Sequence, residues 1–199
     1  WRRAFEEATI DPSVQYFAWA SDHDRWDPCW LKTLVEAMEA DPDVVLAYPL
    51  TRRLDTGGRL LDKPPRLFET QGVTSRDERW SRVCREHPAS GNMGYGLMSA
   101  AALRDAGVFR DVVCPDRLLV AELALRGEFR QVPRELWFRR QFEEASVARQ
   151  QTSLFAGRAP RGRWLPPWLQ HARTLWGVYV TRAARAGERR AAARRADRH

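Results

Sequence analysis

Cysteine is scarce in this sequence, and long apolar runs are absent from it. The three cysteines, Cys29, Cys84 and Cys114, are an odd number at wide spacings with no CxxC pair, which argues against a disulfide framework. We interpret them as buried or free thiols of a protein in the reducing cytoplasm. No segment approaches the roughly 18 consecutive apolar residues of a membrane-spanning helix, and nothing resembles a signal peptide.

An initiator methionine is also missing, because the chain begins at Trp1 in the middle of a pattern. We therefore expect it to be the later part of a longer protein. Its 199 residues correspond to one domain with an appendage, and they are enough to bury a core without a metal or disulfide.

Positive charge is concentrated in the C-terminal part of the chain, although the whole sequence carries +7. Residues 161–199 hold ten arginines against two acidic residues, whereas residues 1–160 hold 23 basic and 24 acidic side chains. A nucleic-acid-binding domain carries its basic surface on the folded body. The nearly neutral body therefore argues against a nucleic-acid partner.

Apolar patterns and turn residues predict strands that alternate with helices. Strands are expected at residues 16–20, 44–48, 93–98, 129–132 and 136–138. Helices are expected up to residue 8, from residue 28 to 40, over residues 77–86, from Ser99 to Gly107, and over residues 118–125. This alternation predicts an α/β sandwich with a mostly parallel sheet.

The C-terminal segment has a different pattern. From Trp164 onward, apolar residues recur every three or four positions and include Trp168, Leu175 and Trp176, which predicts one apolar helix face with arginines mostly elsewhere. We therefore divide the chain into a domain over residues 1–150 and an amphipathic, arginine-rich helical tail over residues 151–199. The tail suits either an anionic membrane surface or docking of its Trp168, Leu175 and Trp176 face onto the domain.

Two aspartates, Asp22 and Asp24, directly follow the first predicted strand. Ligands bind at strand ends in open α/β sheets, and two carboxylates there can reach one divalent cation that bridges phosphate oxygens. The pattern is weak by itself, because Asp41 and Asp43 form a second Asp-x-Asp that is explained as a helix stop. Spacing alone favours a solvated turn that caps the next helix.

Three segments, taken in order, resemble inverting family-2 glycosyltransferases of the GT-A fold. Residues 16–28 (YFAWASDHDRWDP) resemble that family's strand, Asp-x-Asp turn and following helix, and the likeness continues to Pro49. Residues 94–99 (GYGLMS) resemble its acceptor-side strand, and residues 116–127 (DRLLVAELALRG) its catalytic-base helix. The resemblance covers residues 1–146 and implies a Rossmann-like GT-A sheet between helices, without the family's N-terminal nucleotide-binding portion.

The resemblance also implies roles for individual residues. Asp24, with Asp22, would bind Mg²⁺ or Mn²⁺ on the diphosphate of a nucleotide-sugar donor, and Asp22, Gly94 and Tyr95 would contact that donor. Asp116 would be the general base that takes the proton from an acceptor hydroxyl. Its alternative interpretation is a plain helix N-cap, because Pro115 and Asp116 begin a predicted helix.

The implied reaction is transfer of a sugar, with inversion, from a UDP- or GDP-linked donor. The acceptor would be a glycan, a lipid or a protein, as in bacterial polysaccharide biosynthesis, and the enzyme would be cytoplasmic, at the inner face of the membrane if the tail binds lipid. Trp26, Trp30 and Trp137 would either stack on a sugar ring or belong to the core.

The chain departs from the family's pattern in three places. The nucleotide-binding portion is missing, Pro115 stands where many members have a second acid, and Gln141 stands where members often have a metal-binding histidine. These departures leave an alternative function, in which the chain is a non-catalytic remnant of the fold that binds a glycan or a membrane.

Overall fold

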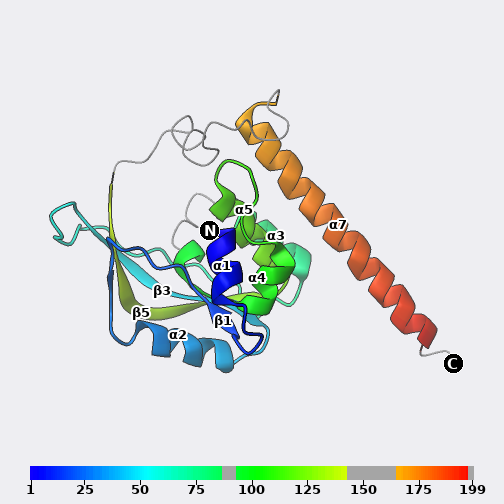
Figure 1. The fold of residues 1–199 in the computed structure, drawn as a ribbon, viewed down its shortest axis with the longest axis horizontal. Helices are drawn as coiled ribbons and strands as arrows, with labels where there is room; N and C mark the ends of the chain where they lie inside the picture. Colours follow the sequence, from blue (N-terminus) through cyan, green and yellow to red (C-terminus); the bar gives the residue numbers. More distant parts are fainter. Residues whose placement is uncertain (87–92, 143–164, 197–199) are drawn as a thin grey trace.

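A five-stranded sheet lies at the centre of the computed structural model, with helices on both of its faces (Figure 1). The structure describes residues 1–86, 93–142 and 165–196, with side chains up to residue 181. The strands are β1 (Tyr16–Phe17), β2 (Arg25–Trp26), β3 (Val44–Leu54), β4 (Leu97–Ser99) and β5 (Glu128–Arg140). Their order in the sheet is β1-β4-β3-β5-β2. The chain is therefore α/β, as predicted.

The sheet is mixed, which corrects the prediction of a mostly parallel sheet. Strands β3 and β5 are parallel, whereas the pairs β1–β4, β3–β4 and β2–β5 are antiparallel. The error has a physical source, since hydrophobic periodicity identifies a strand but carries no information on its direction. The parallel pair, β3 and β5, is joined by the long connection from residue 55 to residue 127, as a parallel pair requires.

The predicted strands have different bounds in the structure. The first keeps two residues and lies at an edge of the sheet, and β4 begins at Leu97 after a short 3₁₀ turn. The two last predicted strands are one continuous strand, β5. Its register with β3 shifts between Val132 and Glu135, where Pro133 lacks the amide hydrogen for the ladder and is accommodated by the irregularity.

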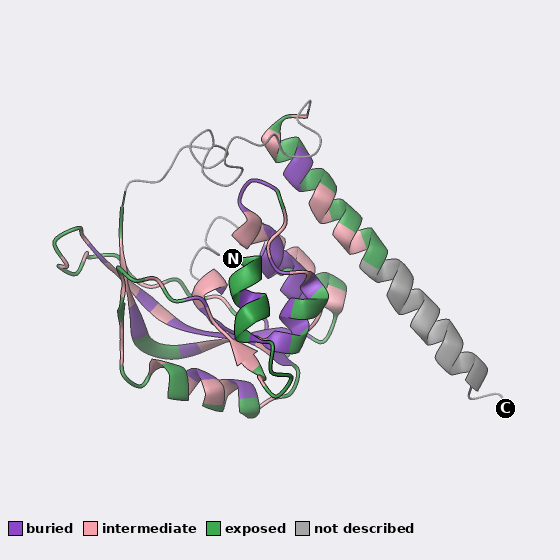
Figure 2. Cartoon of the chain, viewed as in Figure 1, coloured by how far each residue is buried: buried purple, intermediate pink, exposed green. Residues whose placement is uncertain are grey.

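Helices α1 (Arg2–Ala8), α2 (Trp30–Glu39), α3 (Arg76–Arg85), α4 (Ala100–Ala106) and α5 (Pro115–Ala124) surround the sheet. Helix α2 covers one face, where Leu34 and Met38 pack with Val44, Ala47 and Val132. The opposite face is covered by α4 and α5, which contribute half of the buried residues of the larger core. Figure 2 shows the resulting buried centre in β3, β5 and α5.

Local signals at α4 are confirmed in detail. The hydroxyl of Ser99 accepts a hydrogen bond from the amide of Ala102 at 3.3 Å, so Ser99 is the N-cap. Gly107, with φ of 81°, is the left-handed C-cap residue, a conformation that glycine adopts without strain. Helix α2, by contrast, begins at Trp30 rather than at residue 28, and the apolar side chain of Leu31 is exposed.

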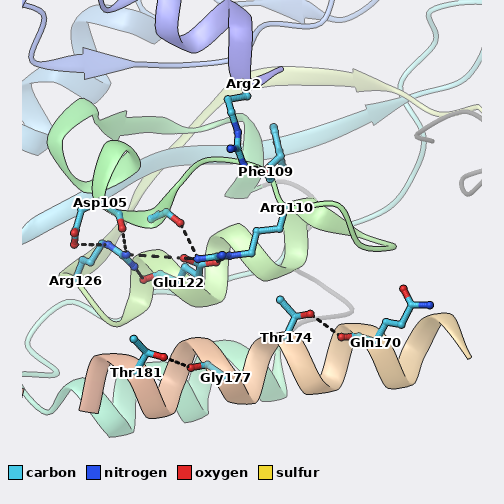
Figure 3. A network of polar contacts seen from close by, with 11 residues as sticks. Arg2, Asp105, Phe109, Arg110, Glu122, Arg126, Gln170, Thr174, Gly177 and Thr181 are labelled. Carbon is cyan, nitrogen blue, oxygen red and sulfur yellow. Dashed lines mark hydrogen bonds and ion pairs between the residues drawn. The ribbon is translucent and has the colours of Figure 1, made fainter. Parts of the chain in front are cut away.

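The buried face of α5 includes a charged residue that apolar patterning did not predict. Glu122 is buried among leucines and alanines. Its carboxylate accepts from the guanidinium of Arg110, at 3.1 Å for one of the two bonds, and pairs with Arg126 (Figure 3). Arg126 in turn lies 3.0 Å from the carboxylate of Asp105. These ion pairs compensate the cost of burying the charge.

The C-terminal helix α7 (Pro167–Ala196) docks on the domain near its start and then extends away from it (Figure 1). Nδ1 of His171 lies 2.8 Å from the carbonyl oxygen of Val113, and the ring of Tyr179 packs on Trp80. Docking of the tail is thus observed, and of the predicted face Leu175 packs against the core, whereas Trp168 and Trp176 are exposed. The predicted domain boundary at residues 150 and 151 lies outside the described residues.

Within the described ranges, none of the helices has the length and apolar character needed to cross a membrane. The three cysteines are free thiols, of which Cys29 is exposed and Cys114 is buried.

Candidate functional site

The carboxylate of Asp24 is anchored to the end of strand β5. Its Oδ2 accepts a hydrogen bond from the indole nitrogen of Trp137 at 3.1 Å, and its Oδ1 accepts one from the backbone amide of Arg140 at 2.8 Å. The Asp24 side chain is 2% exposed. Both bonds join segments more than a hundred residues apart, so the turn that carries Asp24 has a fixed position relative to the sheet.

The other residues of that turn are much more open to solvent. The carboxylate of Asp22 is fully exposed and lies 3.1 Å from Nδ1 of His23. The His23 ring lies between the two aspartates, with Nε2 at 4.0 Å from Oδ1 of Asp24, and it packs edge-on against Phe142. Asp22 and Asp24 therefore share a turn but differ in environment.

Tyr95 connects this turn to two further segments. Its ring packs on Trp137 at a centroid distance of 5.1 Å. Burial raises the pKa of the Tyr95 hydroxyl, the positive charge of Arg139 opposes that rise, and the negative charges of Asp116 and Asp24 add to it. The hydroxyl thus stays protonated at neutral pH and is a hydrogen-bond donor. We call Asp24, Tyr95, Asp116 and Arg139 the Tyr95 site.

Asp116 enters the site from the first turn of α5. The helix begins with Pro115, after Cys114, whose φ of 52° turns the chain sharply. Cys114 therefore occupies the N-cap position, and the interpretation of Asp116 as the N-cap is wrong. Asp116 lies beside Gly94, since a Cβ built on that glycine would be 3.9 Å from the Cβ of Asp116. A carboxylate in the first helical turn is stabilised by the helix dipole.

The structure thus brings Asp24, Gly94, Tyr95 and Asp116 together from three separate segments of the chain, and leaves Asp22 at the solvent side of the turn. The sequence analysis did not include Arg139 among the candidate site residues. Gln141 is exposed, and its side-chain oxygen lies 3.4 Å from the amine of Lys63.

Of the three tryptophans considered for sugar stacking, Trp137 is fully buried and belongs to the core. Its ring stacks on that of Trp26 at 5.2 Å with an interplanar angle of 6°, and Trp30 meets Trp26 edge-on. Trp26 and Trp30 are partly exposed. Trp26 and Trp30 are therefore the accessible end of an aromatic stack whose buried end is Trp137, the residue that donates a hydrogen bond to Asp24.

The donor atoms of this turn suit a hard divalent cation in number and kind. No group of three or more histidine, cysteine, aspartate or glutamate side chains that could hold a metal occurs among the described residues. Mg²⁺, however, is commonly held by one or two carboxylates together with substrate phosphates and water. Each oxygen of Asp24 accepts one hydrogen bond and has a further lone pair, and Asp22 adds an exposed carboxylate.

Two adjoining cavities lie elsewhere on the molecule. The larger, of about 580 Å³, is lined by residues of β3 and β5, the segment of residues 67–69 and the end of α3, including Arg82, Arg85 and Arg130. The smaller, of about 270 Å³, shares Leu67 and Phe68 with it. None of the residues of the Tyr95 site lines either cavity.

Comparison of the sequence with models of known protein families and with curated proteins finds no match.

Proposed function

We propose that this chain is part of an inverting glycosyltransferase that moves a sugar from a nucleotide diphosphate donor to an acceptor hydroxyl. The observation that supports the proposal most strongly is the meeting of Asp24, Tyr95 and Asp116 at one end of the sheet. These residues come from the three segments that resemble the family-2 enzymes. Two carboxylates, a phenolic donor and a guanidinium in one place are the groups that such a transfer requires.

Asp116 is the proposed general base. The acceptor hydroxyl attacks the anomeric carbon as its proton passes to a carboxylate oxygen of Asp116, and the bond from that carbon to the diphosphate oxygen breaks on the opposite face. The first turn of α5 fixes the position of Asp116. Gly94 beside it leaves room for an acceptor to approach.

Tyr95 and Arg139 are proposed to bind the donor. Burial and the nearby carboxylates raise the pKa of Tyr95, so its hydroxyl keeps its proton and donates to a sugar or phosphate oxygen. The guanidinium of Arg139, held over the Trp137 ring at 5.9 Å, supplies positive charge near the departing diphosphate. Charge-assisted hydrogen bonds of this kind are the strong ones.

Asp22 and Asp24 would hold Mg²⁺ or Mn²⁺ together with the diphosphate oxygens. The cation would supply Lewis-acid stabilisation of the charge that builds on the leaving nucleotide diphosphate. The hydrogen bonds from Trp137 and Arg140 orient the Asp24 carboxylate before any ligand binds, which lowers the entropic cost of assembling the site.

The alternative function, a binding module without turnover, is favoured by one observation. Both oxygens of Asp24 already accept hydrogen bonds in a buried position, which is also the arrangement of a purely structural carboxylate. In that case the chain would bind a glycan or a membrane without transferring a sugar.

Calorimetric titration of the chain with UDP and GDP, with and without Mn²⁺, tests the proposal. We expect metal-dependent binding that is lost in Asp24→Asn and retained in Asp43→Asn, the matched change in the second Asp-x-Asp of the chain. Asp116→Asn should retain donor binding and lose sugar transfer. Absence of nucleotide binding by the folded wild-type chain would refute the proposal that this chain is a working transferase by itself, and binding with no transfer under any acceptor condition would favour the binding module.

A further inference from the structure

Helix α7 has apolar side chains on two different faces. One face packs on the domain through His171, Leu175 and Tyr179. The other face carries a line of exposed apolar side chains with helical spacing, which we call the Trp176 stripe: Leu169, Ala172, Trp176 and Val180. Their offsets of three, four and four residues put them on one side of the helix.

The Trp176 stripe is the most apolar exposed feature of this helix, and its central residue is 62% exposed. A surface helix of a globular protein normally presents charged and polar residues to water opposite its packed face. Contiguous exposed apolar groups of this kind mark sites of interaction. Because the helix is already docked by its other face, the stripe is left for a partner outside the domain.

The excess of arginine in the same helix indicates that the partner surface is negatively charged. Arg173 is exposed directly beside the stripe. The helix continues to Ala196, and residues 182–199 contain seven arginines against Glu188 and Asp197. The partner surface must therefore accept apolar side chains and carry negative charge.

We propose that the Trp176 stripe lies in the interface of an anionic lipid membrane, with α7 parallel to the membrane plane. Trp176, with Leu169 and Val180, would enter the boundary between headgroups and acyl chains, where the amphipathic indole ring is favoured. The arginines would pair with lipid phosphates, and each basic residue near such a surface adds about 1 kcal/mol of attraction.

Two other occupants fit the same surface less well. A second copy of the chain would bring together two helices that each carry an excess of arginine, and like charges at an interface are destabilising. A nucleic acid would satisfy the arginines through its phosphates, but it would leave the aliphatic side chains Leu169 and Val180 uncovered.

The proposed contact does not require α7 to leave the domain. The four residues of the stripe are exposed while the helix is docked, so the domain would stay attached while the stripe enters the membrane. The inference is independent of sugar transfer, since it uses no residue of the Tyr95 site.

Vesicle flotation of the full chain tests this proposal. The vesicles are phosphatidylcholine alone or phosphatidylcholine with about one third phosphatidylglycerol, which supplies the anionic surface. We expect binding to the anionic vesicles and at least about tenfold weaker binding to the neutral ones. Trp176→Ser and Leu169→Ser should each weaken binding to anionic vesicles about tenfold, by removing an inserted apolar side chain. Arg173→Glu should also weaken it.

The matched control is Trp1→Ser, because Trp1 is 61% exposed and lies outside α7. It should bind vesicles as the wild type does, and circular dichroism establishes that each variant is folded. Failure of the folded chain to bind anionic vesicles would overturn the proposal. So would equal binding by Trp176→Ser, dimerisation of the wild type that Trp176→Ser abolishes in sedimentation velocity, or retention of a duplex DNA probe that competes fully with vesicles.

Discussion

The indole nitrogen of Trp137 lies 3.1 Å from Oδ2 of Asp24, so a core residue of the last strand fixes a carboxylate on an early turn of the chain. The bond joins the centre of the fold to the candidate site, because Trp137 is fully buried. Its ring also packs against the rings of Tyr95 and Trp26. Folding of β5 and assembly of the site are therefore coupled.

Trp137→Phe should destabilise the protein by about 3 kcal/mol. The change removes buried ring volume and leaves Oδ2 of Asp24 without its donor in a buried position. Urea denaturation followed by far-ultraviolet circular dichroism measures the effect. Trp30→Phe is the control, because the indole nitrogen of Trp30 has no acceptor among the described residues, so the same loss of ring leaves no acceptor unpaired. Equal losses in the two variants would contradict the importance of the bond to Asp24.

Gly96→Ala should destabilise the protein by more than about 2 kcal/mol. A Cβ at residue 96 would lie 2.5 Å from the carbonyl oxygen of Ala47 and 2.8 Å from Cδ1 of Leu46, so the strands would have to separate. Gly94→Ala meets an ordinary contact at 3.9 Å with the Cβ of Asp116 and should leave the midpoint of thermal unfolding nearly unchanged. A larger loss at residue 94 than at residue 96 would contradict this packing.

Glu122→Gln should reduce the free energy of unfolding by about 3 kcal/mol, because it leaves the guanidinium groups of Arg110 and Arg126 without their buried counter-charge. Glu135→Gln is the matched control. Glu135 pairs with Arg52 at 3.1 Å but is 41% exposed, so its loss should cost less than about 1 kcal/mol. Guanidinium chloride titration of both variants compares them, and a cost for Glu122→Gln as small as that of the control would show that the buried pair contributes no net stability.

Cys84 should react with iodoacetamide far more slowly than Cys29 at pH 8. Burial raises the pKa of the Cys84 thiol to about 11, and the reactive species is the thiolate. The labelling rate at Cys84 should therefore increase about tenfold for each pH unit between pH 8 and pH 10, because the pH in this range is still below the pKa of the thiol. Mass spectrometry of the labelled peptides gives the two rates separately, and a rate at Cys84 that is flat over this range would contradict the raised pKa.

Signals that are local in the chain predicted the fold well. Ser99 and Gly107 were identified as the two ends of a helix, and the structure confirms both caps. Such signals depend on a few neighbouring residues and on backbone preferences that each residue carries by itself.

Pairing and burial were harder to predict, because they depend on residues far away in the sequence. The aromatic run around Trp19 indicated a buried strand, yet only Tyr16 and Phe17 join the ladder, and Trp19 packs in an aromatic cluster with Trp1 and Phe109. Glu122 lies in an apolar helix, and nothing near it in sequence indicates that Arg110 and Arg126 meet it there.

In the candidate site, too, residues within recognisable local segments were predicted, and a residue whose position depends on long-range pairing was not. Asp24, Tyr95 and Asp116 were found because each lies in a recognisable segment. Arg139 was missed as a member of the site, because its position beside Tyr95 depends on the register of β5, and register is a property of the folded sheet.

The irregularity of β5 at Pro133 has a consequence for how the strand can vary in length. Side chains alternate between the two faces of a strand, so Trp137 and Arg139 share one face because an even number of steps separates them. Removing or adding one residue at Pro133 would turn both to the other face and bring Phe138 inward, while a change of two would restore their direction. Viable length variants of this segment should therefore differ by pairs of residues, because the two faces of the strand change places at every odd step.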